Sequence, residues 1–187
     1  MDNHPSDPMR KQSGSIKVND LHEAHPQIRA SDWRSPLIRR LLPNGAYTDG
    51  TCGVAESFRS RSAGQPIERT LSLSWAGLRE DFEQVVKTYQ DPVITEFATL
   101  GLACICVSES AKLQITEVTR RGEKADYWLG DKRFLLEVSG QQSGSLDELC
   151  SQKAEQLKSN PFGKAGYVCV ANYGQRSARL WFYEPDK

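Results

Sequence analysis

The sequence predicts an α/β domain with a mixed central sheet flanked by helices. Two observations carry this prediction. From residue 91 onward, segments with helical or strand periodicity follow in the order helix, strand, strand, strand, helix, strand, strand. The first of these helices is apolar nearly all round, which predicts a position deep in the core. We therefore expect residues 91–187 to form the core of the protein.

The residues before this core are expected to form an arm and an extension. Residues 1–30 are polar, without a sustained hydrophobic period, and are typical of a flexible arm. Residues 31–90 are expected to form an N-terminal extension with strand and helix. In chain order, this extension should comprise a short helix over 33–42, an irregular stretch rich in Gly, Ser and Thr over 44–66, a strand over 68–75 and a helix over 78–89.

The core helices have recognisable starting points. The first begins at Asp91, because aspartate can cap free N–H groups and the proline that follows loses no hydrogen bond at the first helical position. It should run to about Ser108. Ser145 and Glu148 form a capping box for the second helix, which should end at about Lys158. The strands of the core are expected over 113–119, 126–129, 133–138, 167–172 and 178–183.

Composition and charge limit the classes of protein to which the chain can belong. Hydrophobic residues make up 38% of the sequence and charged residues 26%, which is typical of a globular protein. Lys and Arg number 24, as do Asp and Glu, so the formal net charge is zero. A dedicated nucleic-acid-binding protein usually carries a basic excess. A local basic patch or a partner protein would have to supply that charge here.

Cysteine usage and hydropathy favour a cytoplasmic protein. The five cysteines form no CxxC pair and the three histidines lie near the start of the sequence, so no zinc site is expected. Cysteines in odd number and in apolar segments suit a reducing compartment. The first residues lack the apolar stretch of a signal peptide. The longest apolar run, 97–107, is shorter than the ~20 residues that span a bilayer, so no membrane association is expected.

Two carboxylates, Asp126 and Glu137, occupy positions that suggest chemistry. Asp126 begins one strand and Glu137 lies near the end of the next, and the segment 130–132 between them is typical of a hairpin turn. Antiparallel pairing would bring the two acids together near one edge of the sheet. Adjacent acids repel unless a cation lies between them, and oxygen ligands suit Mg²⁺ or Mn²⁺. The pair is therefore a candidate metal site.

Two charged residues of the core helices could complete a site. Glu96 lies on the apolar stripe of the first helix, where an acid needs a partner or a metal; alternatively, it only stabilises the helix dipole. Lys153 falls inside the apolar stripe of the second helix, where an inward lysine could orient a nucleophile or stabilise developing charge. Gln152 beside it is a candidate for orienting substrate.

A basic loop precedes the first carboxylate. Arg120, Arg121 and Lys124 would lie beside Asp126 and could hold phosphate, or they could form a solvated turn. Tyr127 could pack in the core or stack on a base.

The joint pattern resembles the PD-(D/E)xK nuclease superfamily. The matching residues are Glu96 in a helix, Asp126 at the start of a strand and Glu137 near the end of the next strand. The stretches 125–130 and 136–140 are similar to a bacterial subgroup of that superfamily. The resemblance implies a restriction-endonuclease-like core over the C-terminal half of the chain. It also implies Mg²⁺-dependent hydrolysis of phosphodiester bonds, with DNA as the expected substrate.

The chain departs from the superfamily motif at two positions. Ser139 stands where the motif has lysine, and Ala125 precedes Asp126 in place of proline. Some superfamily members supply the lysine from the following helix, which is where Lys153 lies. Others keep the fold without activity. Ser139 is then expected to line the substrate site.

Structural roles without chemistry are alternatives for three of these residues. Asp126 could be a turn residue. Lys153 could extend from the edge of its helix into solvent. Glu137 could form a surface ion pair with Lys132 or Arg133.

Two functions follow as hypotheses. In the first, the protein is a metal-dependent nuclease in which Asp126 and Glu137 bind Mg²⁺ or Mn²⁺, assisted by Glu96 and Lys153. In the second, a nuclease-fold module without catalysis binds a protein partner or a second copy of itself. Either would fit a larger complex such as a bacterial defence system. The zero net charge and Ser139 favour the second hypothesis, whereas a Lys153 side chain that points at the two acids would favour the first.

Overall fold

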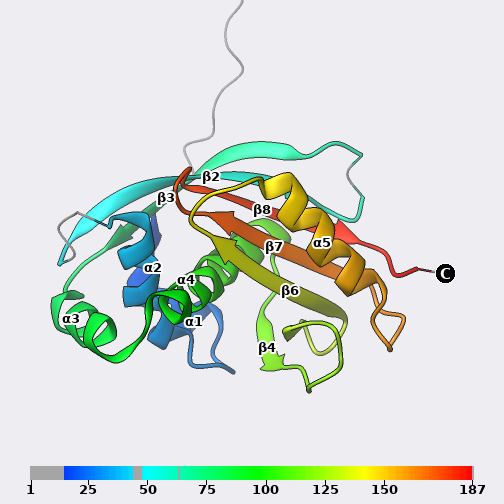
Figure 1. Cartoon of the computed structure of the whole chain (residues 1–187), viewed down its shortest axis with the longest axis horizontal. Coiled ribbons are helices and arrows are strands. Elements are labelled where there is room, and N and C mark those ends of the chain that lie inside the picture. The colour runs from blue at the N-terminus through cyan, green and yellow to red at the C-terminus, as the bar shows by residue number, and fades with distance from the viewer. Residues whose placement is uncertain (1–14, 44–47, 63, 187) are drawn as a thin grey trace, which may run out of the picture.

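The computed structural model describes residues 15–43, 48–62 and 64–186, which form a mixed α/β fold on one eight-stranded sheet (Figure 1). The strands lie in the order β1-β3-β2-β8-β7-β6-β5-β4, with parallel and antiparallel neighbours. The predicted α/β class with a mixed, helix-flanked sheet is confirmed. The strands are β1 (Ile16–Lys17), β2 (Gly50–Arg59), β3 (Ile67–Trp75), β4 (Ile115–Val118), β5 (Tyr127–Leu129), β6 (Phe134–Gln141), β7 (Gly166–Asn172) and β8 (Ser177–Tyr183).

Helices cover both faces of this sheet (Figure 1). α4 packs on one face, mainly against β6 and β7, with α2 on its far side, while α5 packs on the other face against β6, β7 and β8. A π-helical turn, Val107–Ala111, continues α4. The helices are α1 (Leu21–Ala24), α2 (Arg34–Leu41), α3 (Arg79–Thr88), α4 (Asp91–Cys106) and α5 (Leu146–Lys158).

α4 is the core helix of the fold. It begins at Asp91 with proline at the next position, as predicted, and it is buried almost continuously from Ala98 to its end. With the π-helical turn it forms a helical segment of 21 residues, long and apolar enough to cross a membrane by length and composition alone. In the fold most of this segment is buried, because the sheet and α2 cover it.

The predicted order of elements in the C-terminal half is confirmed. β5 and β6 form an antiparallel hairpin in which Tyr127 pairs with Leu136. β6 and β7 are parallel and are connected through α5. The predicted cap of α5 is present, since the Glu148 N–H donates to Ser145 Oγ at 3.3 Å. β7 and β8 then form a second antiparallel pair.

The N-terminal strands extend the same sheet. The predicted irregular stretch 44–66 is wrong over residues 50–59, because they form β2, which pairs with β3 on one side and β8 on the other. Cys52 and Val54 are buried from this strand, between small exposed residues. Strand partners on both sides override the low strand propensity of its two glycines. Residues 44–47 and 63 lie outside the described residues.

Residues 15–30 also belong to the fold, so the predicted flexible arm is wrong for this part. They form β1, α1 and short 3₁₀ turns, and three of their apolar side chains are buried, namely Val18, Leu21 and Ala30. These residues are too widely spaced to produce a helical or strand period, yet each packs against the core. Residues 1–14 of the predicted arm lie outside the described residues.

His25 ties this segment to the core through two hydrogen bonds. The Ile115 N–H donates to His25 Nδ1 at 2.9 Å, so Nε2 carries the proton and donates to the Cys104 carbonyl, also at 2.9 Å. Burial lowers the pKa of His25. The neutral ring therefore bridges α4 and the start of β4.

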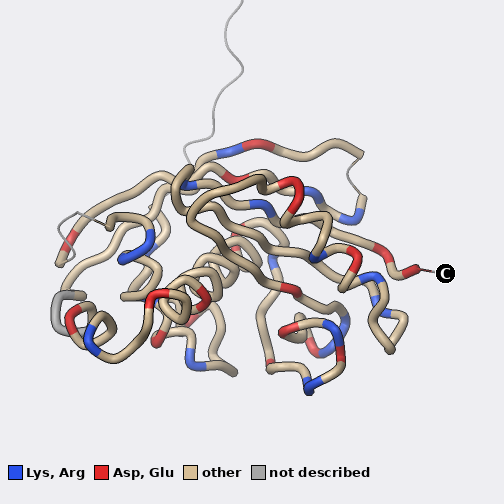
Figure 2. The backbone as a smooth tube through the Cα atoms, viewed as in Figure 1, with Lys and Arg blue, Asp and Glu red and all other residues tan. Residues whose placement is uncertain are grey.

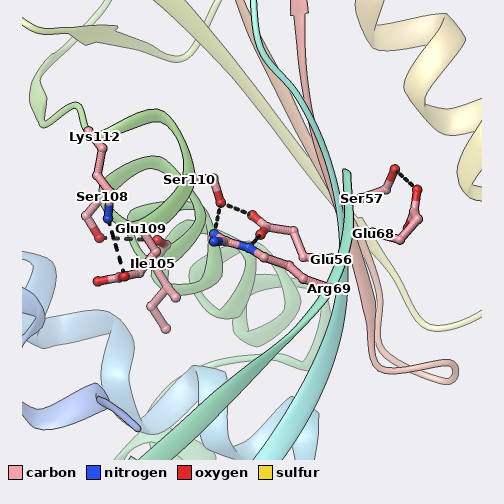
Figure 3. Close-up of polar contacts among 9 residues, drawn as sticks. All are labelled: Glu56, Ser57, Glu68, Arg69, Ile105, Ser108, Glu109, Ser110 and Lys112. Carbon is pink, nitrogen blue, oxygen red and sulfur yellow. Dashed lines mark hydrogen bonds and ion pairs between the residues drawn. The ribbon is translucent and has the colours of Figure 1, made fainter. Parts of the chain in front are cut away.

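A buried ionic cluster joins the π-helical turn to the N-terminal strands (Figure 3). Glu56 of β2 is fully buried, and its Oε2 lies 2.6 Å from Arg69 Nε of β3. The Ser110 hydroxyl donates to the other carboxylate oxygen, Glu56 Oε1, at 2.6 Å, and Arg69 also contacts Ser110. Both oxygens of the buried carboxylate are thus satisfied, which is the condition under which a buried charge is tolerated.

We expect Arg69→Met to lower the free energy of unfolding by on the order of 3 kcal/mol, because it leaves Glu56 charged, buried and without a cation. Urea denaturation measures the loss. A matched control is Arg61→Met, which removes an exposed ion pair with Glu184 and should cost less than about 1 kcal/mol. Equal effects of the two substitutions would contradict the prediction.

Candidate active site

The two predicted carboxylates face each other where β5 begins. Tyr127 pairs with Leu136 in the β5–β6 ladder, so Asp126 lies opposite Glu137 in the same register. The Asp126 N–H donates to the Leu136 carbonyl at 2.9 Å. The Asp126 side chain then replaces a backbone carbonyl of a neighbouring strand, because its Oδ2 accepts the Val138 N–H at 2.7 Å. The sequence prediction that a hairpin brings these acids together is therefore confirmed in its geometry.

Lys153 points at this pair from α5. Its Nζ lies 2.6 Å from Glu137 Oε1, and its side chain is 22% exposed, whereas Glu137 is fully buried. Glu137 Oε2 is buried without a hydrogen-bond partner among the described residues. Lys153 is therefore not a solvent-directed lysine. Nor does Glu137 form the surface ion pair with Lys132 or Arg133 that the sequence left open.

The electrostatics of the pair follow from its burial. Desolvation raises the pKa of Glu137 to about 7, the charge of Asp126 pushes in the same direction, and Lys153 opposes both. Desolvation also raises the pKa of Asp126, against the Val138 N–H and Lys153, which lower it. One lysine therefore compensates only part of the cost of holding two carboxylates together.

A cavity of about 600 Å³ opens beside the pair, between the first half of α4 and the free end of β6. β5 pairs with β6 only up to Leu136, so beyond that point β6 has a strand neighbour on its β7 side alone. The charged residues of the lining, among those described, are Glu96 and Asp126, and we call this the acidic cavity. Its lining consists of Pro92, Thr95, Glu96, Thr99, Leu100, Val118, Asp126, Tyr127, Val138, Ser139, Gly140, Gln141 and Gln142.

A second, shallower depression of about 430 Å³ lies on the other side of Asp126. We call it the basic groove, since it includes the loop with Arg120, Arg121 and Lys124. The predicted position of this loop beside Asp126 is confirmed. Its lining consists of Val118, Thr119, Arg120, Arg121, Gly122, Lys124, Ala125, Asp126 and Gln156. Over the described residues, basic and acidic residues are interspersed in the view of Figure 2.

The structure places two of the other predicted site residues, Glu96 and Ser139, in the lining of the acidic cavity and the third, Gln152, outside the site. Glu96 lines the acidic cavity but is exposed, not buried on an apolar stripe as expected, because α4 becomes continuously buried only from Ala98. Ser139 lines the same cavity. Gln152 is exposed and lies outside the linings of the cavity and the groove. Gln156 takes the place expected for it.

Gln156 is a residue that the sequence reasoning missed. It lines the basic groove, and its Oε1 accepts from Lys153 Nζ at 3.4 Å. The signal that could have found it is the helical spacing, since a residue three positions after Lys153 lies on the same face of α5.

The donor set can be tested against the Mg²⁺ that the resemblance implies. In the described part of the chain, no three His, Cys, Asp or Glu side chains cluster as a metal-binding group. Mg²⁺ is, however, commonly held by one or two carboxylates together with waters and substrate phosphates. The unpartnered Glu137 Oε2 and the neighbouring Asp126 carboxylate supply such a pair. The residues present therefore fit Mg²⁺ or Mn²⁺.

Comparisons of the chain with protein-family models, with curated proteins and with solved structures find no match. The case for a function therefore depends on the geometry of this site.

We expect the metal-free protein to lose stability as the pH rises from about 5 to about 8. The folded state keeps the Glu137 proton up to a pKa of about 7, whereas the unfolded chain releases it near the ordinary value. This contribution is fully present below the unfolded pKa and is lost as the pH rises through the folded one. Glu137→Gln removes this pH-dependent contribution. Between about pH 5 and about pH 8, the free energy of unfolding of the variant should therefore rise by on the order of 2 kcal/mol relative to that of wild type.

Urea denaturation in EDTA at several pH values measures this difference. If the free energies of unfolding of wild type and Glu137→Gln changed in parallel with pH, the Glu137 carboxyl would have its ordinary pKa in the fold, and the prediction would be wrong.

Proposed function

We propose that the protein is a metal-dependent nuclease that hydrolyses phosphodiester bonds in DNA. The observation that carries the proposal is the convergence of Asp126, Glu137 and Lys153, in which Lys153 pairs with the buried Glu137 and the neighbouring Asp126 lines both the acidic cavity and the basic groove. A buried acid with a pKa of about 7, next to a second acid and a lysine, is typical of a functional site. The element order α4-β4-β5-β6-α5-β7 supports a restriction-endonuclease-like core.

Each of these residues has a task that its position allows. Asp126 and Glu137 would hold Mg²⁺ or Mn²⁺, which supplies a more acidic bound water and neutralises charge on the phosphate. Glu96, on the opposite wall of the acidic cavity, would hold a water by a hydrogen bond. In this role the ion pair between Lys153 and Glu137 would break so that Glu137 could bind the metal. The freed ammonium group of Lys153 would then donate to the phosphate oxygen on which charge develops.

Lys153 can supply the cation that is missing at the motif position, where this chain has Ser139. Ser139 lies on β6 two residues after Glu137 and has no charge to contribute. A lysine that enters from the next helix places its ammonium 2.6 Å from the same carboxylate. The cation that the superfamily motif takes from the strand would then come from α5.

DNA is proposed as substrate on the basis of the resemblance and of the basic groove. Arg120 and Lys124 lie beside Asp126, where they can neutralise phosphates that flank the reacting bond. This loop supplies local positive charge in a chain of zero formal net charge.

The alternative is a catalytically inactive nuclease-fold module that binds a protein, for example in a bacterial defence complex. The observation that favours it is the short Lys153–Glu137 ion pair, which neutralises the buried acid without any metal. Ser139 in the motif position favours it as well. In that case the pair would only stabilise the packing of α5 on β6.

We expect Mg²⁺- or Mn²⁺-dependent cleavage of plasmid and single-stranded DNA, abolished by Glu137→Ala and reduced on the order of 100-fold by Lys153→Met. Near-saturating Mn²⁺ should also raise Tm by on the order of 5 °C in wild type and not in Glu137→Ala.

The matched control is Lys158→Met, on the same helix, whose lysine pairs with Glu155 at 3.1 Å. It should leave cleavage unchanged. Absence of both cleavage and a metal-dependent change in Tm would refute the nuclease and favour the inactive module.

A further inference from the structure

The acidic cavity and the basic groove are contiguous, but they differ in charge. Val118 and Asp126 line both, so a molecule can pass from one to the other across Asp126. Val118 forms an apolar rim between them and is 67% exposed. Apart from the shared Asp126, the charged lining of the cavity among the described residues is the carboxylate of Glu96 and that of the groove is the guanidinium and ammonium groups of its loop, so the two sides suit different parts of a nucleotide.

The lining of the acidic cavity suits a neutral ring. Leu100, Tyr127 and Val138 contribute apolar and aromatic surface, and Thr95 and Gln141 contribute a hydroxyl and an amide. The Gln141 amide nitrogen is buried without a hydrogen-bond partner among the described residues. A phosphate would be repelled by the acids of this cavity, whereas a nucleobase can use its apolar faces and its polar edge here.

The basic groove suits the phosphate chain. Its three basic side chains are exposed, and Lys124 reaches toward α5, where its Nζ donates to Ser159 Oγ at 3.3 Å. Exposed Arg and Lys side chains are the usual partners of phosphate oxygens. A nucleotide that lies across Asp126 would then have its base in the cavity and its phosphates in the groove.

We infer that the substrate is unpaired DNA, with a base next to the scissile phosphate bound in the acidic cavity. This inference rests on the proposed nuclease function and names its substrate class. A base inside a duplex is stacked and paired, and taking it out costs a few kcal/mol. Single-stranded DNA binds without that cost, so it should be preferred over a duplex of the same sequence.

The test measures binding apart from cleavage. Fluorescence anisotropy in EDTA compares a labelled single-stranded oligonucleotide, the same strand in a duplex, and strands that carry one abasic site at successive positions. Wild type should bind the single strand about tenfold more tightly than the duplex, and one abasic position should weaken binding about tenfold. Thr95→Phe, which narrows the cavity from α4, should weaken binding of the intact strand but not of that abasic strand.

Val93→Phe is the matched control, because Val93 is partly buried on the same helix and lies outside the cavity lining. It should bind like wild type. Base-dependent binding without metal-dependent cleavage would support the cavity assignment and refute the nuclease. Cleavage of duplex and single strand at equal rates, with no effect of abasic sites or of Thr95→Phe, would overturn the inference and leave the nuclease proposal standing. Absence of any binding would also overturn it.

Discussion

The burial of α4 is the constraint on which the remaining structure depends. A helix that is apolar on nearly every side must be covered on every side, and here the sheet, α2 and the segment 15–33 share that task. At the end of β6 the approach is so close that a Cβ at Gly140 would collide with Thr99. The same packing sets the first turns of α4 beside the end of β6, where Thr95 and Glu96 form one wall of the acidic cavity.

The site itself arises where strand pairing stops. The β5–β6 ladder stops at the pair of Tyr127 and Leu136, and beyond it β6 pairs with β7 alone. The carboxylate of Asp126, which precedes β5, replaces a strand carbonyl as acceptor for the Val138 N–H. One oxygen of Asp126 is thus fixed by the backbone. Glu137 lies directly opposite Asp126. It is buried where α5 packs on β6, and it forms an ion pair with Lys153. Because this end of β6 is bordered by α4 and α5, the hairpin that carries the two carboxylates and the basic loop before it are brought together with Glu96 from α4 and Lys153 from α5.

Much of the C-terminal half could be predicted from the sequence, since α4, α5 and the strands around them have strong periodicity or caps. The convergence of Asp126, Glu137 and Lys153 could also be predicted, because a hairpin turn and a helical stripe fix their directions. β2 could not, because a segment with two glycines forms a strand here only where β3 and β8 supply partners. The Glu56–Arg69–Ser110 cluster was equally inaccessible, since it joins residues far apart in sequence. The exposure of Glu96 depends on how far α4 extends past the sheet, which periodicity does not encode.

The position of β8 in the sheet has a consequence for biosynthesis. β8 separates β2 from β7, so the hairpin of β2 and β3 joins the rest of the sheet only through β8, which is synthesised after the other strands of this sheet. Until then β2, which carries the buried Val54, has no strand partner on its β8 side. Closure over so many residues is slow, and exposed strand edges are prone to aggregate in the meantime. Nascent chains that stall before residue 177 would therefore depend on chaperones far more than chains that include β8.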